Sequence, residues 1–285
     1  MDIAIIGAGP AGLTAGMYAG RAGISCRIFE RMYPGGKLVW IEDIENFPGF
    51  PEGITGRDLA EKIYRQTLRF KVEVVFEDVI KVEAGGTSIS IVTGSGVYDC
   101  RAVIVASGSI PRKLGVPGEE ALIGRGVSYC ALCDGYFFRN KTVAVVGEGK
   151  QVLSEIEFLR KLAKVVWVTR EKEIPGDTGV TVINGKTREI LGTDHVSGIV
   201  VESPSGVQTI NVDGVFIFAG FKPSADFLPP ETKKDAAGFL ITDQNFQTSV
   251  KGIFACGDIR AGSLKQAVSA CSEGAQVIQA IHRIL

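Results

Sequence analysis

The first thirty residues carry a hydrophobic pattern that predicts a strand, a helix and a second strand. Residues 2–6 form a short run rich in β-branched side chains, and residues 25–29 form another that ends before Glu30. Between them, residues 7–12 read Gly-Ala-Gly-Pro-Ala-Gly, and an alanine-rich segment follows to about residue 22, where Gly23 is suited to end a helix. The pattern indicates one complete βαβ unit.

The same pattern returns in the middle of the chain. Residues 142–146 and 165–169 predict strands, and a helix is expected from about residue 152 to residue 162. The turn before that helix reads Gly-Glu-Gly-Lys-Gln-Val over residues 147–152. Two such units predict an α/β protein with two Rossmann-like domains of the three-layer ββα type.

The domain boundaries are expected where proline and glycine interrupt the pattern. Two such stretches, residues 109–118 and 219–223, mark the points where the chain would pass between domains. We therefore predict a discontinuous domain made of residues 1–112 and 221–285, with a smaller domain, residues 113–220, inserted into it. Two crossings at one place also predict a hinge.

The first glycine turn fits a dinucleotide-binding fingerprint. Gly7, Gly9 and Gly12 follow a strand and open a helix, and Glu30 comes 23 residues after Gly7, near the expected distance. The first glycine allows the tight turn, the second lets backbone N–H groups approach a pyrophosphate, and the third lets the helix pack close to the strand. We predict a dinucleotide cofactor here.

Composition and charge exclude several classes of protein. The net charge is −1, so no general field favours nucleic acid or an anionic membrane. No apolar run approaches the roughly 18 residues of a membrane span, and the N-terminus lacks a signal-peptide pattern. Six cysteines among 285 residues are too few for a disulfide scaffold. We expect a cytoplasmic protein.

One pair of cysteines is spaced for redox chemistry. Cys130 and Cys133 are separated by two residues, the spacing of dithiol redox sites. A zinc half-site is the rival interpretation, but no second such pair exists and neither histidine is near a cysteine in sequence; no metal is expected. An inert pair is a further alternative. Asp134 follows directly and suits a general acid for the leaving thiolate, with a helix cap or a solvent-exposed salt bridge as the alternative.

The chain resembles the low-molecular-weight thioredoxin reductases, which are FAD-dependent pyridine nucleotide-disulfide oxidoreductases of type II. The likeness extends over nearly the whole chain. It is carried by the segments 7–12, 34–38 (Pro-Gly-Gly-Lys-Leu), 45–51 (Glu-Asn-Phe-Pro-Gly-Phe-Pro), 130–135 (Cys-Ala-Leu-Cys-Asp-Gly) and 252–258 (Gly-Ile-Phe-Ala-Cys-Gly-Asp).

The resemblance implies a homodimeric flavoprotein whose two domains rotate, so that the disulfide faces the flavin in one arrangement and the dithiol faces thioredoxin in the other. It implies that Cys130 attacks thioredoxin and that Cys133 faces the flavin. The FAD-binding residues it implies are Gly7, Gly9, Pro10, Ala11, Gly12, Glu30, Gly36, Lys37, Asn46, Gly257, Asp258, Lys265, Gln266 and Ala267.

Lys265 is a mild departure from that family, which commonly has Arg-Gln where this chain has Lys265-Gln266. The resemblance places the N-terminus of the following helix against the isoalloxazine ring, where its positive end would stabilise reduced, anionic flavin. A solvated surface lysine is the alternative interpretation for Lys265.

The second glycine turn departs from the family, which binds NADPH there. Val152 stands where the family has Gly or Ala, and Glu148 brings a carboxylate into the pyrophosphate turn. The basic motif that holds the 2′-phosphate is replaced by Thr-Arg-Glu-Lys-Glu over residues 169–173, and the helix before the strand at 180–183 is expected to be missing. Arg170 has the offset from Gly147 that Glu30 has from Gly7, and Glu171 would instead suit the ribose of NADH. We do not expect NADPH to be a cofactor.

Members of the family with a degraded nucleotide site include ferredoxin-dependent flavin thioredoxin reductases, which this chain resembles. The resemblance therefore implies an enzyme that passes electrons from reduced ferredoxin through FAD and the Cys130–Cys133 disulfide to thioredoxin. Two alternatives remain open: an NADPH- or NADH-dependent thioredoxin reductase with a divergent nucleotide site, and a non-catalytic flavoprotein that senses redox state.

Overall fold

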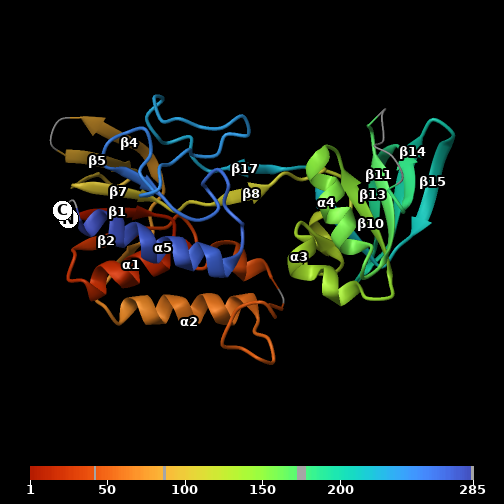
Figure 1. The fold of residues 1–285 in the computed structure, drawn as a ribbon, viewed down its shortest axis with the longest axis horizontal. Helices are drawn as coiled ribbons and strands as arrows, with labels where there is room; N and C mark the ends of the chain where they lie inside the picture. The colour runs from red at the N-terminus through yellow and green to blue at the C-terminus, as the bar shows by residue number, and fades with distance from the viewer. Residues whose placement is uncertain (42, 86–87, 172–177, 284–285) are drawn as a thin grey trace. The chain divides into compact units, whose positions relative to one another are not determined.

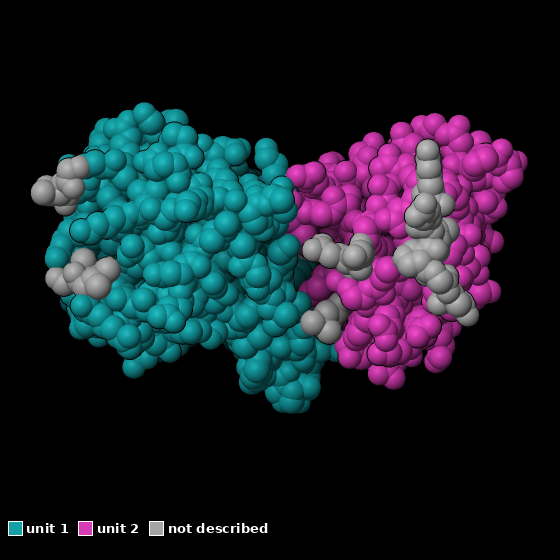
Figure 2. All heavy atoms as spheres, turned by 45° about the horizontal axis from the view of Figure 1, so that its top comes forward, with its two compact units in different colours: residues 1–110, 222–285 teal, residues 111–221 magenta. Residues whose placement is uncertain are grey.

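The chain divides into two compact units, each described here by itself. The computed structural model describes residues 1–285 except 42, 86–87, 172–177 and 284–285 (Figure 1). Unit 1 comprises Met1–Ile110 and Lys222–Leu285, and unit 2 comprises Pro111–Phe221 (Figure 2). The two connecting segments contain the strands β8 (Ser109–Pro111) and β17 (Phe221–Pro223), which pair with each other.

Unit 1 is built on a five-stranded parallel sheet. Its strand order is β18 (Ile253–Ala255), β7 (Ala102–Val105), β1 (Ile3–Ile6), β2 (Cys26–Phe29) and β3 (Glu73–Val75). On one face lie the helices α1 (Pro10–Arg21), α2 (Gly56–Leu68) and α5 (Ala267–His282), and on the other lies the antiparallel sheet of β4 (Val79–Gly85), β5 (Ser88–Thr93) and β6 (Val97–Cys100) (Figure 1).

The layers of unit 1 follow from side chains that alternate along the strands. Ile3 and Ile5 are buried in the core beneath the helices, whereas Ala4 and Ile6 are buried in the core under the antiparallel sheet. Successive side chains of a strand point to opposite faces, so the continuous apolar run at residues 3–6 is what a strand covered on both sides requires.

Unit 2 repeats the plan. Its parallel sheet has the order β12 (Thr181–Asn184), β11 (Lys164–Thr169), β10 (Thr142–Gly147), β16 (Gly214–Phe218) and β9 (Val127–Ser128). One face packs on α4 (Lys150–Leu159) and on the segment α3 (Ala131–Asp134) and η3 (Gly135–Phe138), and the other packs on the antiparallel strands β13 (Lys186–Gly192), β14 (Val196–Ser203) and β15 (Gly206–Asn211). The expected α/β class with Rossmann-like sheets is confirmed.

Helix α4 differs from the expectation at its ends. It begins at Lys150 rather than near residue 152, and it ends at Leu159 rather than at residue 162. Gly149 has a φ of +90°, which lets the chain turn from the strand directly into the helix. The apolar spacing located the buried face, with Val152, Ile156 and Leu159 nearly inaccessible to solvent, but it did not mark the first helical turn.

Three short 3₁₀ segments complete the described elements: η1 (Gly36–Trp40), η2 (Glu120–Leu122) and η3. The expectation of a missing helix between β11 and β12 concerns a stretch in which residues 172–177 lie outside the described residues. In the part of the chain that is described, no helix combines the length and apolar character needed to cross a membrane.

Candidate functional site

Cys130 and Cys133 are joined by a disulfide in unit 2, with their Cα atoms 5.3 Å apart. Cys130 is the N-cap of the short helix α3, and its Sγ accepts a hydrogen bond from the Cys133 N–H at 3.2 Å. An N-terminal helical turn favours negative charge, so this position stabilises a Cys130 thiolate when the disulfide opens. A bonded sulfur pair is an oxidised dithiol, in agreement with the redox interpretation and not with that of a zinc half-site.

Asp134 lies at the end of α3, one residue after Cys133. Its Oδ2 accepts a hydrogen bond from the Ser128 hydroxyl at 2.5 Å. Burial raises the pKa of the Asp134 carboxyl, and the Ser128 bond opposes that rise. A carboxyl with a raised pKa, next in sequence to a redox cysteine, is suited to act as a general acid. Asp134 is also the N-cap residue of η3, but its side chain makes no capping hydrogen bond there.

Two polar contacts near the disulfide were missed by sequence reasoning. The Ser128 hydroxyl, besides donating to Asp134, accepts the Cys130 N–H at 3.1 Å. Glu119 is buried and accepts hydrogen bonds from the Tyr129 hydroxyl at 2.9 Å and from the backbone N–H groups of Leu114 and Gly115. Together they hold residues 128–130. The available signal was a serine, a tyrosine and the cysteine in direct succession, which is too common a pattern to indicate a role.

The glycine turn of unit 1 has the shape that a pyrophosphate requires. Gly7 has a φ of +102°, and a Cβ there would lie 2.6 Å from the Ala106 carbonyl oxygen. At Gly9, by contrast, a Cβ would meet no atom within 4 Å. Helix α1 starts next to this open position, with no side-chain cap and no acidic residue in its first turn. Its N-terminal N–H groups are thus available to an anion.

Glu30, at the end of β2, turns back onto this turn. Its carboxylate accepts the Ala8 N–H at 2.8 Å through Oε2 and the Met32 N–H at 3.0 Å through Oε1. A carboxylate held at the end of the second strand of a βαβ unit is where the ribose hydroxyls of a bound dinucleotide are received. The loop at Gly35 and Gly36 also reaches the turn, because Gly35 N–H donates to Ala8 O at 2.7 Å and a Cβ on Gly36 would lie 3.2 Å from the Gly9 Cα.

Residues from opposite ends of the chain meet beside this turn. Lys37, in η1, forms an ion pair with Asp258, which follows β18, and the Asn46 side-chain amide donates to Gln266 Oε1 at 3.1 Å. The Asp258 side chain is only 11% exposed. The structure thus pairs four residues that sequence reasoning took from four separate segments.

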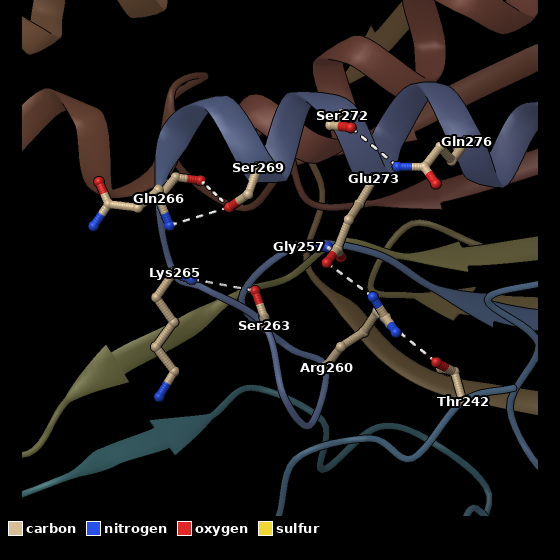
Figure 3. Close-up of polar contacts among 10 residues, drawn as sticks. All are labelled: Thr242, Gly257, Arg260, Ser263, Lys265, Gln266, Ser269, Ser272, Glu273 and Gln276. Atoms are coloured by element: carbon tan, nitrogen blue, oxygen red, sulfur yellow. Dashed lines mark hydrogen bonds and ion pairs between the residues drawn. The ribbon is translucent and has the colours of Figure 1, made fainter. Parts of the chain in front are cut away.

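Gln266 is the N-cap of α5, and Lys265 precedes it (Figure 3). Ser269 holds this helix start, accepting the Gln266 N–H at 3.4 Å and donating to the Gln266 carbonyl at 2.9 Å (Figure 3). Lys265 has a φ of +58°, and its Nζ lies 4.4 Å from the centre of the Phe239 ring. Burial and the nearby Lys37 lower its pKa. Lys265 is thus half-buried, which disagrees with the alternative of a solvated surface lysine.

The second glycine turn, in unit 2, is built differently. The positive φ falls on Gly149, whereas the first turn has it on Gly7. Val152 is buried, with its Cγ2 3.0 Å from the Cβ position of Gly147; at the equivalent position of the first turn a Cβ on Gly12 would lie 1.9 Å from Gly7 O. The larger side chain therefore fills the space in which helix and strand approach each other in unit 1.

Two carboxylates lie at this second turn. Glu171 Oε1 accepts the Gly149 N–H at 2.7 Å, and Glu148 Oε1 forms an ion pair with Arg170 Nε at 2.5 Å. Arg170, which sequence spacing made the counterpart of Glu30, therefore pairs with the turn's own carboxylate, and Glu171 is the residue that contacts the backbone. The remaining basic and acidic positions of this stretch, Lys172 and Glu173, lie outside the described residues.

The two turns differ in the groups they can hold. The unit 1 turn combines an open glycine position, a bare helix N-terminus and a carboxylate at the end of β2, which fit FAD. In the unit 2 turn, the Glu148 carboxylate lies near the place of a pyrophosphate and pairs with Arg170, and Glu171 holds the Gly149 N–H as Glu30 holds the Ala8 N–H in unit 1. Repulsion between anions in such a setting outweighs a single backbone hydrogen bond.

Comparisons with known proteins identify the family of the chain. The family model for pyridine nucleotide-disulphide oxidoreductases matches residues 1–274. The thioredoxin reductase of Listeria innocua is 40% identical, over 96% of this chain and 90% of its own, and that of Treponema pallidum is 36% identical, over 96% and 94%. The crystal structure of thioredoxin reductase from Streptococcus pyogenes superposes with a TM-score of 0.93 at 38% identity, covering 99% of this chain and 97% of that one.

Proposed function

We propose that this chain, which belongs to the pyridine nucleotide-disulphide oxidoreductase family, is a flavoprotein thioredoxin reductase. The observation that supports this best is the Cys130–Cys133 disulfide with Asp134 beside it, in a chain that also carries a dinucleotide turn suited to FAD. The relatives of 36% to 40% identity named thioredoxin reductase support the choice of thioredoxin as substrate.

FAD would be held by unit 1. Gly7, Gly9 and Gly12, with Pro10 and Ala11, would form its pyrophosphate site at the start of α1, and Glu30 would bind the adenosine ribose. The flavin side would be formed by Gly36, Lys37, Asn46, Gly257, Asp258, Lys265, Gln266 and Ala267. When bound, FAD accepts electrons from the donor and supplies an electron pair to the disulfide.

The chain's own residues would carry out the exchange with thioredoxin. The Cys130 thiolate attacks one sulfur of the thioredoxin disulfide and forms a mixed disulfide, and the other thioredoxin sulfur leaves as a thiolate. Cys133 then attacks Cys130 Sγ, which restores the Cys130–Cys133 disulfide and releases thioredoxin as a dithiol. Asp134, whose pKa is raised by burial, would supply a proton to a departing sulfur. Cys133 is also the cysteine that would face the flavin.

We propose reduced ferredoxin as the electron donor. The supporting observation is the second glycine turn, where Glu148 pairs with Arg170 and the buried Val152 lies against Gly147. Two reduced ferredoxins would each give one electron, and two protons from solvent would complete the thioredoxin dithiol. The proposal includes a homodimer in the cytoplasm, with thioredoxin and ferredoxin as partners; sedimentation of the purified protein would test the dimer.

A second candidate donor is NADH, and one observation favours it. Glu171 contacts Gly149 N–H at 2.7 Å much as Glu30 contacts Ala8 N–H at 2.8 Å in the turn suited to FAD. A carboxylate there pairs with free ribose hydroxyls and repels the 2′-phosphate of NADPH. NADH would therefore be preferred over NADPH if either were used.

An anaerobic titration separates these donors. We expect reduced ferredoxin to bleach the flavin absorbance and to sustain thioredoxin reduction, with no bleaching by NADPH or NADH. Rapid bleaching by NADH that slows in Glu171→Gln would establish the second candidate in its place. Rapid bleaching by NADPH would overturn both donor assignments, whereas thioredoxin left unreduced by every donor would overturn the activity itself.

A further inference from the structure

Glu273, in the middle of α5, reaches back to the turn that follows β18. Its Oε2 accepts the Gly257 N–H at 2.7 Å, and its Oε1 forms an ion pair with the Arg260 Nη1 at 2.8 Å (Figure 3). The two carboxylate oxygens thus hold both ends of a four-residue turn, whose own Arg260 N–H donates to Gly257 O at 3.0 Å. Asp258 lies inside this turn.

Arg260 is fixed on its other side as well. Its Nε donates to Thr242 Oγ1 at 3.0 Å (Figure 3). Its guanidinium lies 4.6 Å from the centre of the Phe246 ring. The ion pair is largely shielded from solvent, with side-chain exposures of 19% for Arg260 and 14% for Glu273. Removal of either partner would leave the other charge unpaired and shielded from solvent, which is strongly destabilising. The two side chains are therefore expected to stay paired.

We call the Glu273–Arg260 ion pair the brace, because it holds the turn at residues 257–260. This turn packs against the beginning of α1. A Cβ on Gly257 would lie 2.8 Å from the Ala11 Cβ, and a Cβ on Gly274, the residue after Glu273, would lie 2.3 Å from the Ala11 carbonyl oxygen. Gly257 and Gly274 therefore both lie in close contact with the first turn of α1. A shift of the turn at Gly257 would move Asp258 relative to the glycine turn at Gly7 and Gly9.

We propose that Glu273 and Arg260 are positioning residues for FAD, acting through Gly257 and Asp258 rather than through contact with the cofactor. This inference rests on the proposed function in that it requires unit 1 to bind FAD. Asp258 must present its carboxylate at one place, since it pairs with Lys37 on a separate segment, and the brace sets the backbone that carries it.

The test measures FAD binding by the purified apoprotein of three variants against the wild type. Glu273→Gln keeps an acceptor for Gly257 N–H but removes the charge that pairs with Arg260. Arg260→Lys keeps the charge but removes the Nε that donates to Thr242 Oγ1. Glu61→Gln is the matched control, since it breaks an exposed ion pair with Arg65 on α2, at 2.6 Å.

We expect the FAD dissociation constant to rise by about tenfold or more in Glu273→Gln and by a smaller factor in Arg260→Lys, with Glu61→Gln equal to the wild type. The midpoint potential of the bound flavin should shift in the same order, a change that general loosening of the fold would not produce. Thermal unfolding of the apoproteins checks that each variant is folded.

Two outcomes overturn the inference, and they are distinguishable. If the wild type binds FAD and both brace variants bind it equally well with an unchanged potential, the positioning role is wrong and the proposed function stands. If the wild-type apoprotein binds no FAD, the proposed function fails at its first step and the inference fails with it. Should Glu273→Gln not fold, Arg260→Lys decides the matter by the same two measurements.

Discussion

Ser128 lies 2.5 Å from Asp134, measured from the serine hydroxyl oxygen to Oδ2, and the same hydroxyl accepts the N–H of Cys130 at 3.1 Å. One side chain therefore touches both the carboxyl that would supply a proton and the backbone of the cysteine that would attack thioredoxin. The pKa of Asp134 is the balance of two opposing causes: burial, which raises it and is the larger, and the Ser128 bond, which lowers it.

Ser128→Ala removes the smaller of these causes, so we expect the pKa of Asp134 to rise further. The carboxyl then keeps its proton to higher pH, and the alkaline limb of thioredoxin reduction should move to higher pH. At neutral pH the rate should fall by about threefold to tenfold, because Asp134 is less well oriented. Ser128→Thr retains the hydroxyl and serves as the control. An alkaline limb that stays in place in Ser128→Ala would show that the bond does not tune Asp134.

Asp134→Asn tests the same carboxyl through protein stability. Because burial raises its pKa in the folded state, folded protein binds the Asp134 proton more tightly than unfolded protein does. The stabilisation is complete below the ordinary carboxyl value of 3.8 and is lost as pH rises through the raised folded value. In thermal unfolding, the wild type should therefore lose stability relative to Asp134→Asn as the pH rises from the ordinary carboxyl pKa through the raised folded pKa. Parallel pH curves for the two proteins would contradict the burial of an ionisable group here.

Cys133→Ser is expected to abolish catalysis and leave the cofactor in place. Without Cys133 the disulfide cannot re-form and the mixed disulfide with thioredoxin cannot be resolved, so turnover should drop by about a thousandfold or more. The visible spectrum of bound FAD should persist, because no atom of Cys133 belongs to unit 1. Cys271→Ser, a free cysteine in α5, is the control. Undiminished thioredoxin reduction in Cys133→Ser would rule out the dithiol mechanism.

Alanine should lower the stability of the apoprotein at Gly12 and weaken FAD binding at Gly9. At Gly12 a Cβ would lie 1.9 Å from Gly7 O, so Gly12→Ala should cost about 1–3 kcal/mol of unfolding free energy even without cofactor. At Gly9 a Cβ meets no atom within 4 Å, so Gly9→Ala should leave the apoprotein stable and weaken FAD binding by filling the space beside α1. Denaturant unfolding and FAD titration of both apoproteins measure this contrast. Equal FAD affinity for Gly9→Ala and wild type would show that the open position is not used.

Much of the fold was predictable because its signals are local. One stretch of chain, residues 3–21, contains strand β1, the turn at Gly7 and Gly9, and helix α1. Hydrophobic periodicity and glycine spacing within that stretch predict all three. The pair Cys130 and Cys133 is equally local, since the short separation brings the sulfurs together on one helical turn. The start of α4 was missed because Gly149 lets a helix begin before its first apolar residue.

Other contacts depended on where distant segments meet. Counting residues made Arg170 the counterpart of Glu30, yet it is Glu171 that reaches the Gly149 N–H. Offset alone does not say which of the two residues contacts the backbone of the turn, because both follow the end of β11, where the regular alternation of strand side chains no longer applies. Nor does anything near Ser128 in the chain show that its hydroxyl ends on Asp134.

By itself, then, the sequence determined two Rossmann-like units, a glycine turn suited to a dinucleotide and a redox-spaced cysteine pair. Only the tertiary structure decided that Lys37 meets Asp258 and that Glu273 and Arg260 brace the turn between them. The physical reason is that strand order in the sheet places β18 at one edge and brings α5 across α1, and this arrangement is a property of the packed layers rather than of any one stretch of chain.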